Sequence, residues 1–90
     1  MIDVVALGEL LIDFAAKSTD AAGYPTMAAN PGGAPGNFLA ALNAYGRKTA
    51  FLGKVGNDAF GHLLLGTLNA AGIVTKGIVV DDSVFTTLAF

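Results

Sequence analysis

The chain has 90 residues, 53% of them hydrophobic and 13% charged, and its formal net charge is −2. This length corresponds to one small domain, and the absence of a Lys or Arg cluster argues against nucleic acid as a partner. The sequence contains no run of about 18 apolar residues, so it predicts no membrane-spanning helix and no membrane partner. A typical soluble domain has roughly 25% charged residues. A chain of this size cannot bury so large an apolar fraction by itself. We therefore expect it to pack against a further layer or to self-associate.

The sequence contains no cysteine, which excludes disulfides, thiolate metal sites and thiol nucleophiles. A cysteine-free chain favours a cytoplasmic location. The apolar start is interrupted by Asp3 and Glu9 and has no basic leader, so we expect no secretory signal.

The first third of the chain predicts strands and a connecting segment. Residues 1–10 are almost continuously apolar, which is typical of a buried strand in a parallel sheet. A second extended piece is predicted over residues 11–16. Residues 17–29 are small and polar and contain Gly23 and Pro25, which predicts a loop or an edge hairpin.

A dense turn signal, PGGAPG at residues 31–36, precedes a predicted helix over residues 35–45. Pro35 suits the first turn of a helix, where no N–H partner is required. Gly46 is a typical residue at a helix end. The expected apolar face of this helix consists of Phe38, Leu39, Leu42 and Tyr45.

A strand over residues 49–55 and a helix over residues 58–71 are predicted next. Asn57 or Asp58 is the expected cap of that helix, and Gly72 its end. Its expected apolar face consists of Phe60, Leu63, Leu64, Leu68 and Ala71.

The tail predicts a pair of short strands, residues 77–81 and 86–90, around a turn at Asp82 and Ser83. The alternation of strands and helices is typical of α/β layers with right-handed crossovers. We therefore expect a central, mainly parallel sheet that contains residues 2–8 and 49–55.

The glycine-rich loop is the first candidate for a binding site. A helix N-terminus presents unpaired N–H groups, and glycines let a ligand approach the backbone. The Asn37 amide both donates and accepts hydrogen bonds, which suits vicinal hydroxyls. The alternative is that Gly32, Gly33 and Gly36 only permit a tight turn and that Asn37 caps the helix locally. The residues alone leave both interpretations open.

Asp13 is the second candidate, because it follows an apolar run and a buried carboxylate needs a polar partner. That partner is either a sugar hydroxyl or a neighbouring backbone N–H. Glu9 fits either a site residue or a cap of the loop. His62 is the single histidine, and we expect it on the surface of the second helix.

Two nucleotide-binding motifs do not fit the sequence. The dinucleotide fingerprint requires G-x-G-x-x-G after the first strand, and the P-loop requires G-K followed by Ser or Thr. The first strand leads instead into GELLID at residues 8–13, and Val55 follows Gly53 and Lys54. We therefore expect no ATP-phosphate site in this chain.

The motifs in their order resemble the PfkB-type, ribokinase-like carbohydrate kinases, and the fructokinases in particular. The resemblance extends from the first strand to the last residue. Two departures are Leu39, where the pattern has a small residue, and Gly36, where it has Ala; the glycine should loosen the helix start. The matching segments are GELLIDF at 8–14, GGAPGN at 32–37 with Gly46 and Gly56, GKVGNDAFG at 53–61, Gly72 and TTLAF at 86–90.

The resemblance implies the N-terminal part of a three-layer α/β/α fold with a small β lid, formed by about residues 12–30 and 77–90. In the family such a lid covers the sugar and in many members mediates dimerisation. Asp13, Gly32, Gly33 and Asn37 would bind the sugar hydroxyls. The family transfers the γ-phosphoryl group of ATP to a primary hydroxyl with Mg²⁺. Its catalytic Asp lies near the C-terminus, so we expect residues 1–90 to be a truncated sugar-binding part with no catalytic or metal-binding residue.

Three functions remain open at this stage. The chain is the sugar-recognition part of a fructokinase-like enzyme, a binding module without catalysis, or an oligomerisation element without a ligand. The sugar itself is not determined by the sequence, because kinases for ribose, adenosine and ketodeoxygluconate share the architecture. A homodimer or higher oligomer, through the lid or an open sheet edge, is the expected assembly.

Overall fold

The computed structural model describes the backbone of residues 1–90 and the side chains of all of them except Ala34, Pro35 and Phe38. Its backbone forms two three-stranded sheets and two α-helices. No helix in the described part of the chain is long and apolar enough to cross a membrane.

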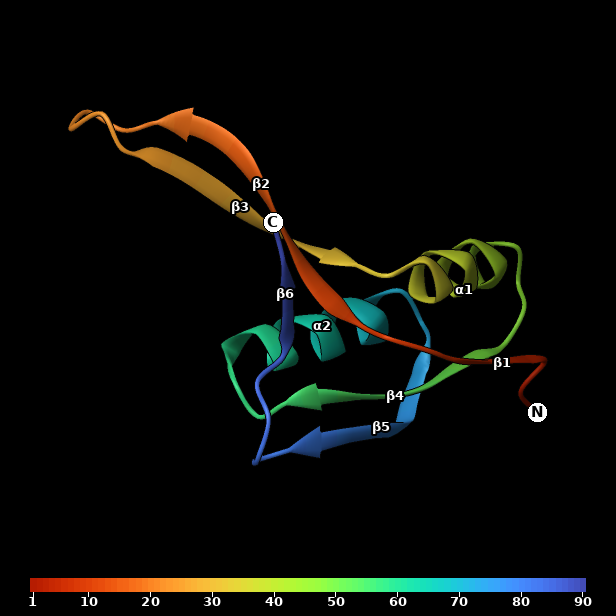
Figure 1. Cartoon of the computed structure of the whole chain (residues 1–90). Helices are drawn as coiled ribbons and strands as arrows, with labels where there is room; N and C mark the ends of the chain where they lie inside the picture. The colour runs from red at the N-terminus through yellow and green to blue at the C-terminus, as the bar shows by residue number, and fades with distance from the viewer.

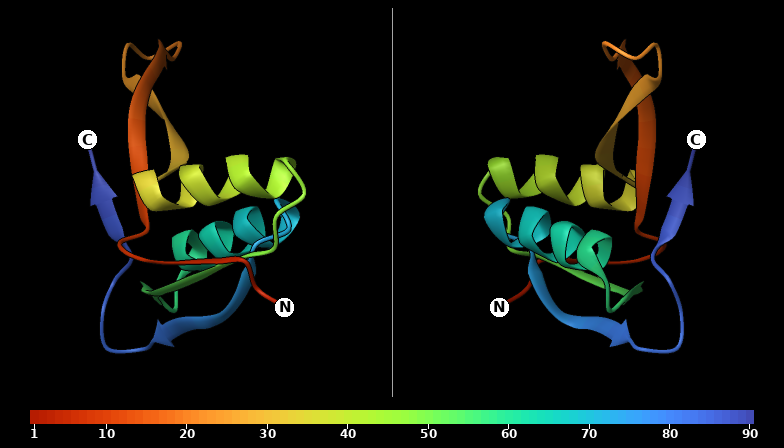
Figure 2. Two further views of the ribbon diagram at one scale, coloured as in Figure 1. Left: turned by 90° about the vertical axis from the view of Figure 1, so that its right-hand side faces the viewer. Right: turned by 90° about the vertical axis from the view of Figure 1, so that its left-hand side faces the viewer.

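The first sheet is parallel and has the strand order β1-β4-β5 (Figure 1). It consists of β1 (Val4–Leu7), β4 (Thr49–Gly56) and β5 (Val74–Asp81). Along the chain each new strand of this sheet is added on the same side of the one before it. Right-handed connections from β1 to β4 and from β4 to β5 therefore place their helices on the same face of the sheet. Figure 2 shows α1 (Ala34–Ala44) and α2 (Ala59–Ala70) on one side of this sheet. The expected parallel sheet containing residues 2–8 and 49–55 is confirmed, and within it β1 pairs directly with β4.

The second sheet has the order β3-β2-β6 and contains β2 (Leu11–Thr19), β3 (Pro25–Gly32) and β6 (Thr87–Ala89). Strands β2 and β3 form an antiparallel hairpin that projects away from the helices (Figure 1). At its tip the Asp20 carboxylate accepts hydrogen bonds from two backbone N–H groups, and Gly23 has φ 87°. Of the two predictions for residues 17–29, the hairpin is correct.

Both predicted terminal strands are present, but the prediction that they form a pair is wrong. The first of them belongs to β5, which pairs with β4 in the parallel sheet, whereas β6 pairs with β2 in the second sheet. Residues 77–81 therefore do not lie in the same sheet as the hairpin. The prediction failed because two short strands around a turn look like a hairpin locally, while their partners lie far away in the sequence.

Both helices begin and end within one residue of the predicted positions. Asp58 is the N-cap of α2, and its carboxylate accepts a hydrogen bond from the Gly61 N–H at 2.7 Å. Gly46 and Gly72 follow the helices with φ 87° and 82°, a conformation that favours glycine.

The core lies between the helices and the parallel sheet and extends under β2. Two predicted core positions are exposed. Tyr45 lies past the last turn of α1 at its C-cap, and the helical rotation of about 100° per residue turns Leu63 away from its buried neighbour Leu64. The Phe38 side chain lies outside the described part. The buried residues of the hydrophobic core cluster are Leu10, Ile12, Leu39, Phe51, Val55, Leu64, Leu68, Ile73 and Ile78.

The face of the parallel sheet opposite the helices carries apolar residues without a covering layer. Val5, Leu7 and Val79 are 53%, 79% and 56% exposed. The chain exposes 5672 Å², whereas a folded monomer of 9.1 kDa exposes about 4,900 Å². The projecting hairpin (Figure 1) and this bare face both contribute exposed surface.

Candidate functional site

Asp13 lies on β2, on the face of the second sheet opposite the core. Its neighbours Ile12 and Phe14 point to the other face, where Ile12 is completely buried and the Phe14 ring packs edge-on against Phe60, with the ring centroids 5.5 Å apart. Because side chains alternate along a strand, this packing turns the Asp13 carboxylate outward. Asp13 is exposed, and its carboxylate forms no hydrogen bond with any described residue.

Asn30 on β3 is directly opposite Asp13 in the antiparallel pair. Directly paired residues have their side chains on the same face. The Asn30 side chain is exposed, and its only hydrogen bond to the described residues is a 3.5 Å contact to the Ala28 carbonyl. Sequence reasoning missed Asn30, because only the register of the hairpin brings it beside Asp13.

Gly32 and Gly33 join β3 to α1, and at both positions the chain lies close to other residues. A Cβ atom at Gly32 would lie 2.8 Å from Leu11 Cδ1 and 3.5 Å from Asp13 Cβ. At Gly33 it would lie 2.7 Å from the Glu9 carbonyl oxygen, and the φ of 122° also favours glycine. The two glycines therefore bring the loop backbone against β2, beside Asp13.

Helix α1 begins beside this loop without a side-chain cap. Gly33 is its N-cap residue, and no side chain caps its N–H groups. The Asn37 N–H donates to the Gly33 carbonyl at 3.3 Å, while the exposed Asn37 amide forms no hydrogen bond with a described residue. Among the described residues the Asn37 side chain thus does not act as a cap of the helix.

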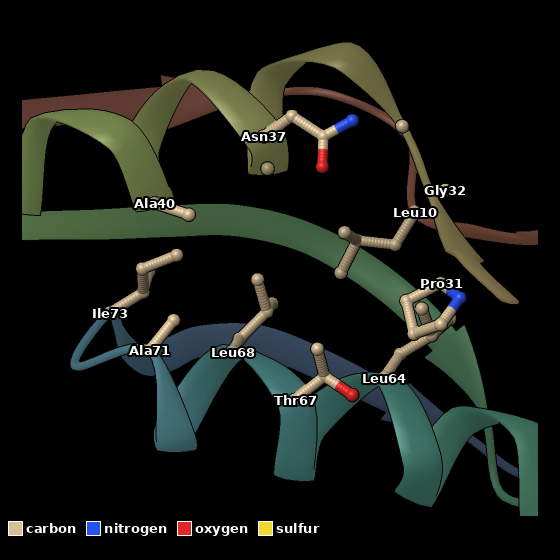
Figure 3. A pocket seen from close by; sticks show the side chains of 12 residues that line it. Leu10, Pro31, Gly32, Asn37, Ala40, Leu64, Thr67, Leu68, Ala71 and Ile73 are labelled. Atoms are coloured by element: carbon tan, nitrogen blue, oxygen red, sulfur yellow. The ribbon is translucent and has the colours of Figure 1, made fainter. Parts of the chain in front are cut away.

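Gly32, Gly33 and Asn37 line one hollow of about 70 Å³ between α1 and α2 (Figure 3). Its wall is mainly apolar and includes Leu10, Leu64 and Leu68. Such a wall does not match the hydroxyls of a sugar, whose binding needs polar partners. Asp13 does not line this hollow, so the convergence of Asp13 and Asn37 on one polar pocket stays a prediction.

Other polar side chains at the ends of β4 and β5 are engaged with one another. The Lys54 ammonium lies 3.0 Å from Asp81, and hydrogen bonds from Ser83, together with Lys54, lower the pKa of Asp81 to about 2. His62 is exposed, as predicted, and hydrogen-bonds to Asn57. Within the described part of the chain, no three His, Asp or Glu side chains gather as a metal site would require.

The whole chain matches one protein family, described as pfkB family carbohydrate kinase, over residues 1–90. Fructokinase-2 of Solanum lycopersicum is 43% identical over 89 residues, which cover 97% of this chain and 27% of that protein. Probable fructokinase-4 of Arabidopsis thaliana is 42% identical over the same shares of both chains. The chain thus spans little more than a quarter of the length of these curated relatives.

Solved structures share the fold. Fructokinase from Xylella fastidiosa has a TM-score of 0.87 at 34% identity, over 94% of this chain and 26% of that one. A sugar kinase of Pyrococcus horikoshii in complex with ATP has a TM-score of 0.84 at 35% identity, over 94% of this chain and 28% of that one. The α/β fold class expected from the sequence, the N-terminal part of a ribokinase-like fold, is confirmed.

Proposed function

The chain belongs to the pfkB family of carbohydrate kinases, and from this premise we propose that it is the sugar-recognition part of an ATP-dependent fructokinase. That enzyme would phosphorylate a primary hydroxyl of fructose. The observation that carries the choice of sugar is the 43% identity to a fructokinase over 97% of the chain. A cytoplasmic location, expected from the cysteine-free sequence, is part of the same proposal.

In this proposal two groups of polar atoms bind the sugar, one on the β2–β3 hairpin and one at the glycine loop and the start of α1. The Asp13 carboxylate accepts hydrogen bonds from sugar hydroxyls, and the Asn30 amide beside it binds a neighbouring hydroxyl. Across the glycine loop, the Asn37 amide and the backbone of Gly32 and Gly33 complete the set. The outward orientation of Asp13 and the absence of a side-chain cap on α1 support these roles.

ATP and Mg²⁺ are required by the proposed reaction, but the described residues do not form a site for them. Among the described residues no three His, Asp or Glu side chains gather as a metal site would require, and the sequence has neither the dinucleotide fingerprint nor the P-loop motif. When bound, Mg²⁺–ATP supplies the phosphoryl group and neutralises its charge. We propose that this chain orients the sugar hydroxyl and that the 90 residues alone do not phosphorylate it.

A hybrid enzyme tests the proposal. The chain would replace the matching segment of Fructokinase-2 of Solanum lycopersicum, and ATP-dependent fructose phosphorylation would be measured. We expect an active hybrid. Asp13→Ala should lower kcat/KM about 10- to 150-fold, because a hydrogen bond to a charged group contributes about 1.5–3 kcal/mol. Thr26→Ala, farther along the same hairpin, is the matched control. An Asp13→Ala hybrid as efficient as the parent would contradict the role of Asp13.

One observation favours a second candidate, an oligomerisation element without a ligand. The bare face of the parallel sheet exposes Val5, Leu7 and Val79. Large exposed apolar patches are typical of association surfaces. Calorimetric titration of the chain with fructose separates the two candidates. Heat of binding that disappears in Asp13→Ala supports sugar recognition, while the absence of any binding by the folded chain supports the second candidate.

A further inference from the structure

A cluster of hydrogen bonds joins β4, α2 and the chain that enters β6. The Asp58 Oδ1 atom accepts from the Gly61 N–H and from the Thr86 hydroxyl, each at 2.7 Å. Its Oδ2 atom accepts from the Thr86 N–H at 2.9 Å. The Thr86 hydroxyl in turn accepts from the N–H of Gly56, the last residue of β4, at 3.1 Å. These four residues are called the Asp58–Thr86 junction below.

The two glycines allow the junction to close. A Cβ atom at Gly56 would lie 2.6 Å from the Thr86 nitrogen and 2.7 Å from Asp58 Oδ2. At Gly61 it would lie 3.0 Å from the Thr86 hydroxyl oxygen. Such approaches leave no room for a side chain, so the backbone and the two polar side chains pack directly on one another. The junction is therefore a closed polar contact and not an open cleft.

Two hydrogen-bonded points attach the segment after β5 to the body of the chain: Asp82, which accepts from the Asn57 amide at 2.6 Å, and Thr86, which lies directly before β6. Thr86 is only 4% exposed, whereas Val84 and Phe85 just before it are 43% and 92% exposed. Hydrogen bonds from the Thr86 N–H, the Thr86 hydroxyl and the Gly61 N–H lower the pKa of Asp58. The carboxylate is thus ionised at neutral pH, and bonds to an ionised acceptor are stronger than neutral ones.

The strand that begins next to Thr86 is short and lies beside the candidate sugar-binding carboxylate. Strand β6 runs along β2 (Figure 2) with the pairs Leu11↔Thr87, Ile12↔Leu88 and Asp13↔Ala89. Three residue pairs are too few to define a register by themselves. The hydrogen bonds of Thr86, directly before the strand, help to fix the position of β6 along β2.

We propose that Asp58 and Thr86 are positioning residues, which hold β6 against β2 and thereby keep Asp13 oriented towards the sugar. The part of this inference that concerns the sugar rests on the proposed function. The mechanical part does not, because it concerns only the attachment of β6. The GNDAFG motif around Asp58 and the TTLAF ending that begins with Thr86 would thus hold β6 in place together, although Asp58 and Thr86 are 28 residues apart in the sequence.

Amide hydrogen exchange of the 90-residue chain, followed by NMR, tests the mechanical part. Thr86→Val removes the hydroxyl at nearly constant volume, and Thr86→Ser restores it. We expect exchange in β6 to become about tenfold faster in Thr86→Val, as for the loss of a charge-assisted hydrogen bond, and to stay near the parent value in Thr86→Ser. Amides of β4 should be unchanged in both variants, except that of Gly56, whose N–H loses its acceptor in Thr86→Val.

Asp58→Asn is a second variant that keeps the helix cap. Asn is as good an N-cap as Asp, so α2 should remain intact. Its amide nitrogen, however, cannot accept from the Thr86 N–H as Oδ2 does. We again expect faster exchange confined to β6. Unchanged exchange in β6, or equal acceleration across β4 and β6, in both Thr86→Val and Asp58→Asn would overturn the proposal.

Fructose affinity tests the link to the site. In the parent chain and in Thr86→Ser the dissociation constants should agree within about twofold, whereas Thr86→Val should weaken binding about three- to tenfold. Equal affinity in Thr86→Val, together with a loosened β6, would overturn the link to Asp13. If the parent chain binds no fructose, the proposed function fails, and the exchange data still decide whether the junction holds β6.

Discussion

Replacing Gly36 by Ala should stabilise the chain. Gly36 is the third residue of α1, and its φ is not positive, so an alanine fits the backbone. A Cβ atom at this position would lie 3.6 Å from Leu10 Cδ2 and 3.7 Å from Leu68 Cδ2, which are ordinary van der Waals distances. Both leucines line the hollow between the helices, so the added methyl group would fill part of it.

Two contributions set the size of the effect. Ala is favoured over Gly by about 0.8–1 kcal/mol in a helix interior, and by less in the first turn. Burying one methyl group adds up to about 0.8 kcal/mol. We therefore expect the free energy of unfolding to rise by about 1 kcal/mol. For a domain of this size that corresponds to an increase in Tm of about 4–8 °C.

Guanidinium chloride and thermal unfolding, followed by far-UV circular dichroism, measure this change. Gly66→Ala is the matched control, because Gly66 lies within α2 and a Cβ atom there would contact nothing within 4 Å. The change in unfolding free energy of Gly66→Ala therefore measures the helix propensity of Ala over Gly without a contribution from side-chain packing. Gly33→Ala is the opposite control: its φ of 122° and its contact with the Glu9 carbonyl predict a loss of about 1–3 kcal/mol.

A destabilised Gly36→Ala variant, measured beside a stabilised Gly66→Ala variant, would refute the reasoning. It would mean that the helices cannot accept a methyl group at the observed distances. Fructose affinity provides a further check, because a Cβ atom at position 36 would face Leu10 and Leu68 in the apolar part of the hollow. The affinity of Gly36→Ala should equal that of the parent chain, and a marked loss would place the sugar against these two leucines.

Asn30→Ala should weaken fructose binding about two- to tenfold in calorimetry, because one net hydrogen bond contributes about 0.5–1.5 kcal/mol; an equal loss in Thr26→Ala would contradict a specific role. The pKa of Asp81 is lowered from 3.8 to about 2, so its carboxylate stabilises the fold above about pH 4 and loses this contribution as the pH falls towards 2. The denaturation midpoint should therefore drop over this range, and a drop as large in Asp81→Asn would exclude Asp81 as its source. The chain should self-associate at micromolar concentration in sedimentation, and Leu7→Lys should shift it towards monomer, because the bare sheet face would then carry a charge. A monomeric parent chain would contradict this expectation.

Local signals in the sequence determined the α/β class and the bounds of both helices. Asp58, Gly46 and Gly72 mark helix ends because capping and positive φ depend on one or two residues. The continuous apolar run at residues 49–55 indicated a buried parallel strand for a similarly local reason. The motif order indicated the family as well, which the match over residues 1–90 confirmed.

Only the tertiary structure determined which strands and side chains that are distant in the sequence lie next to each other. Apolar alternation tells which face a strand buries but not which strand lies beside it, so the separation of β5 and β6 into two sheets could not be predicted. For the same reason Asn30 was missed, because the hairpin register alone places it opposite Asp13. Thr86 reads locally as an ordinary strand residue. Its hydrogen bonds to Asp58 span 28 positions, and they form only when folding brings β6 and the start of α2 together.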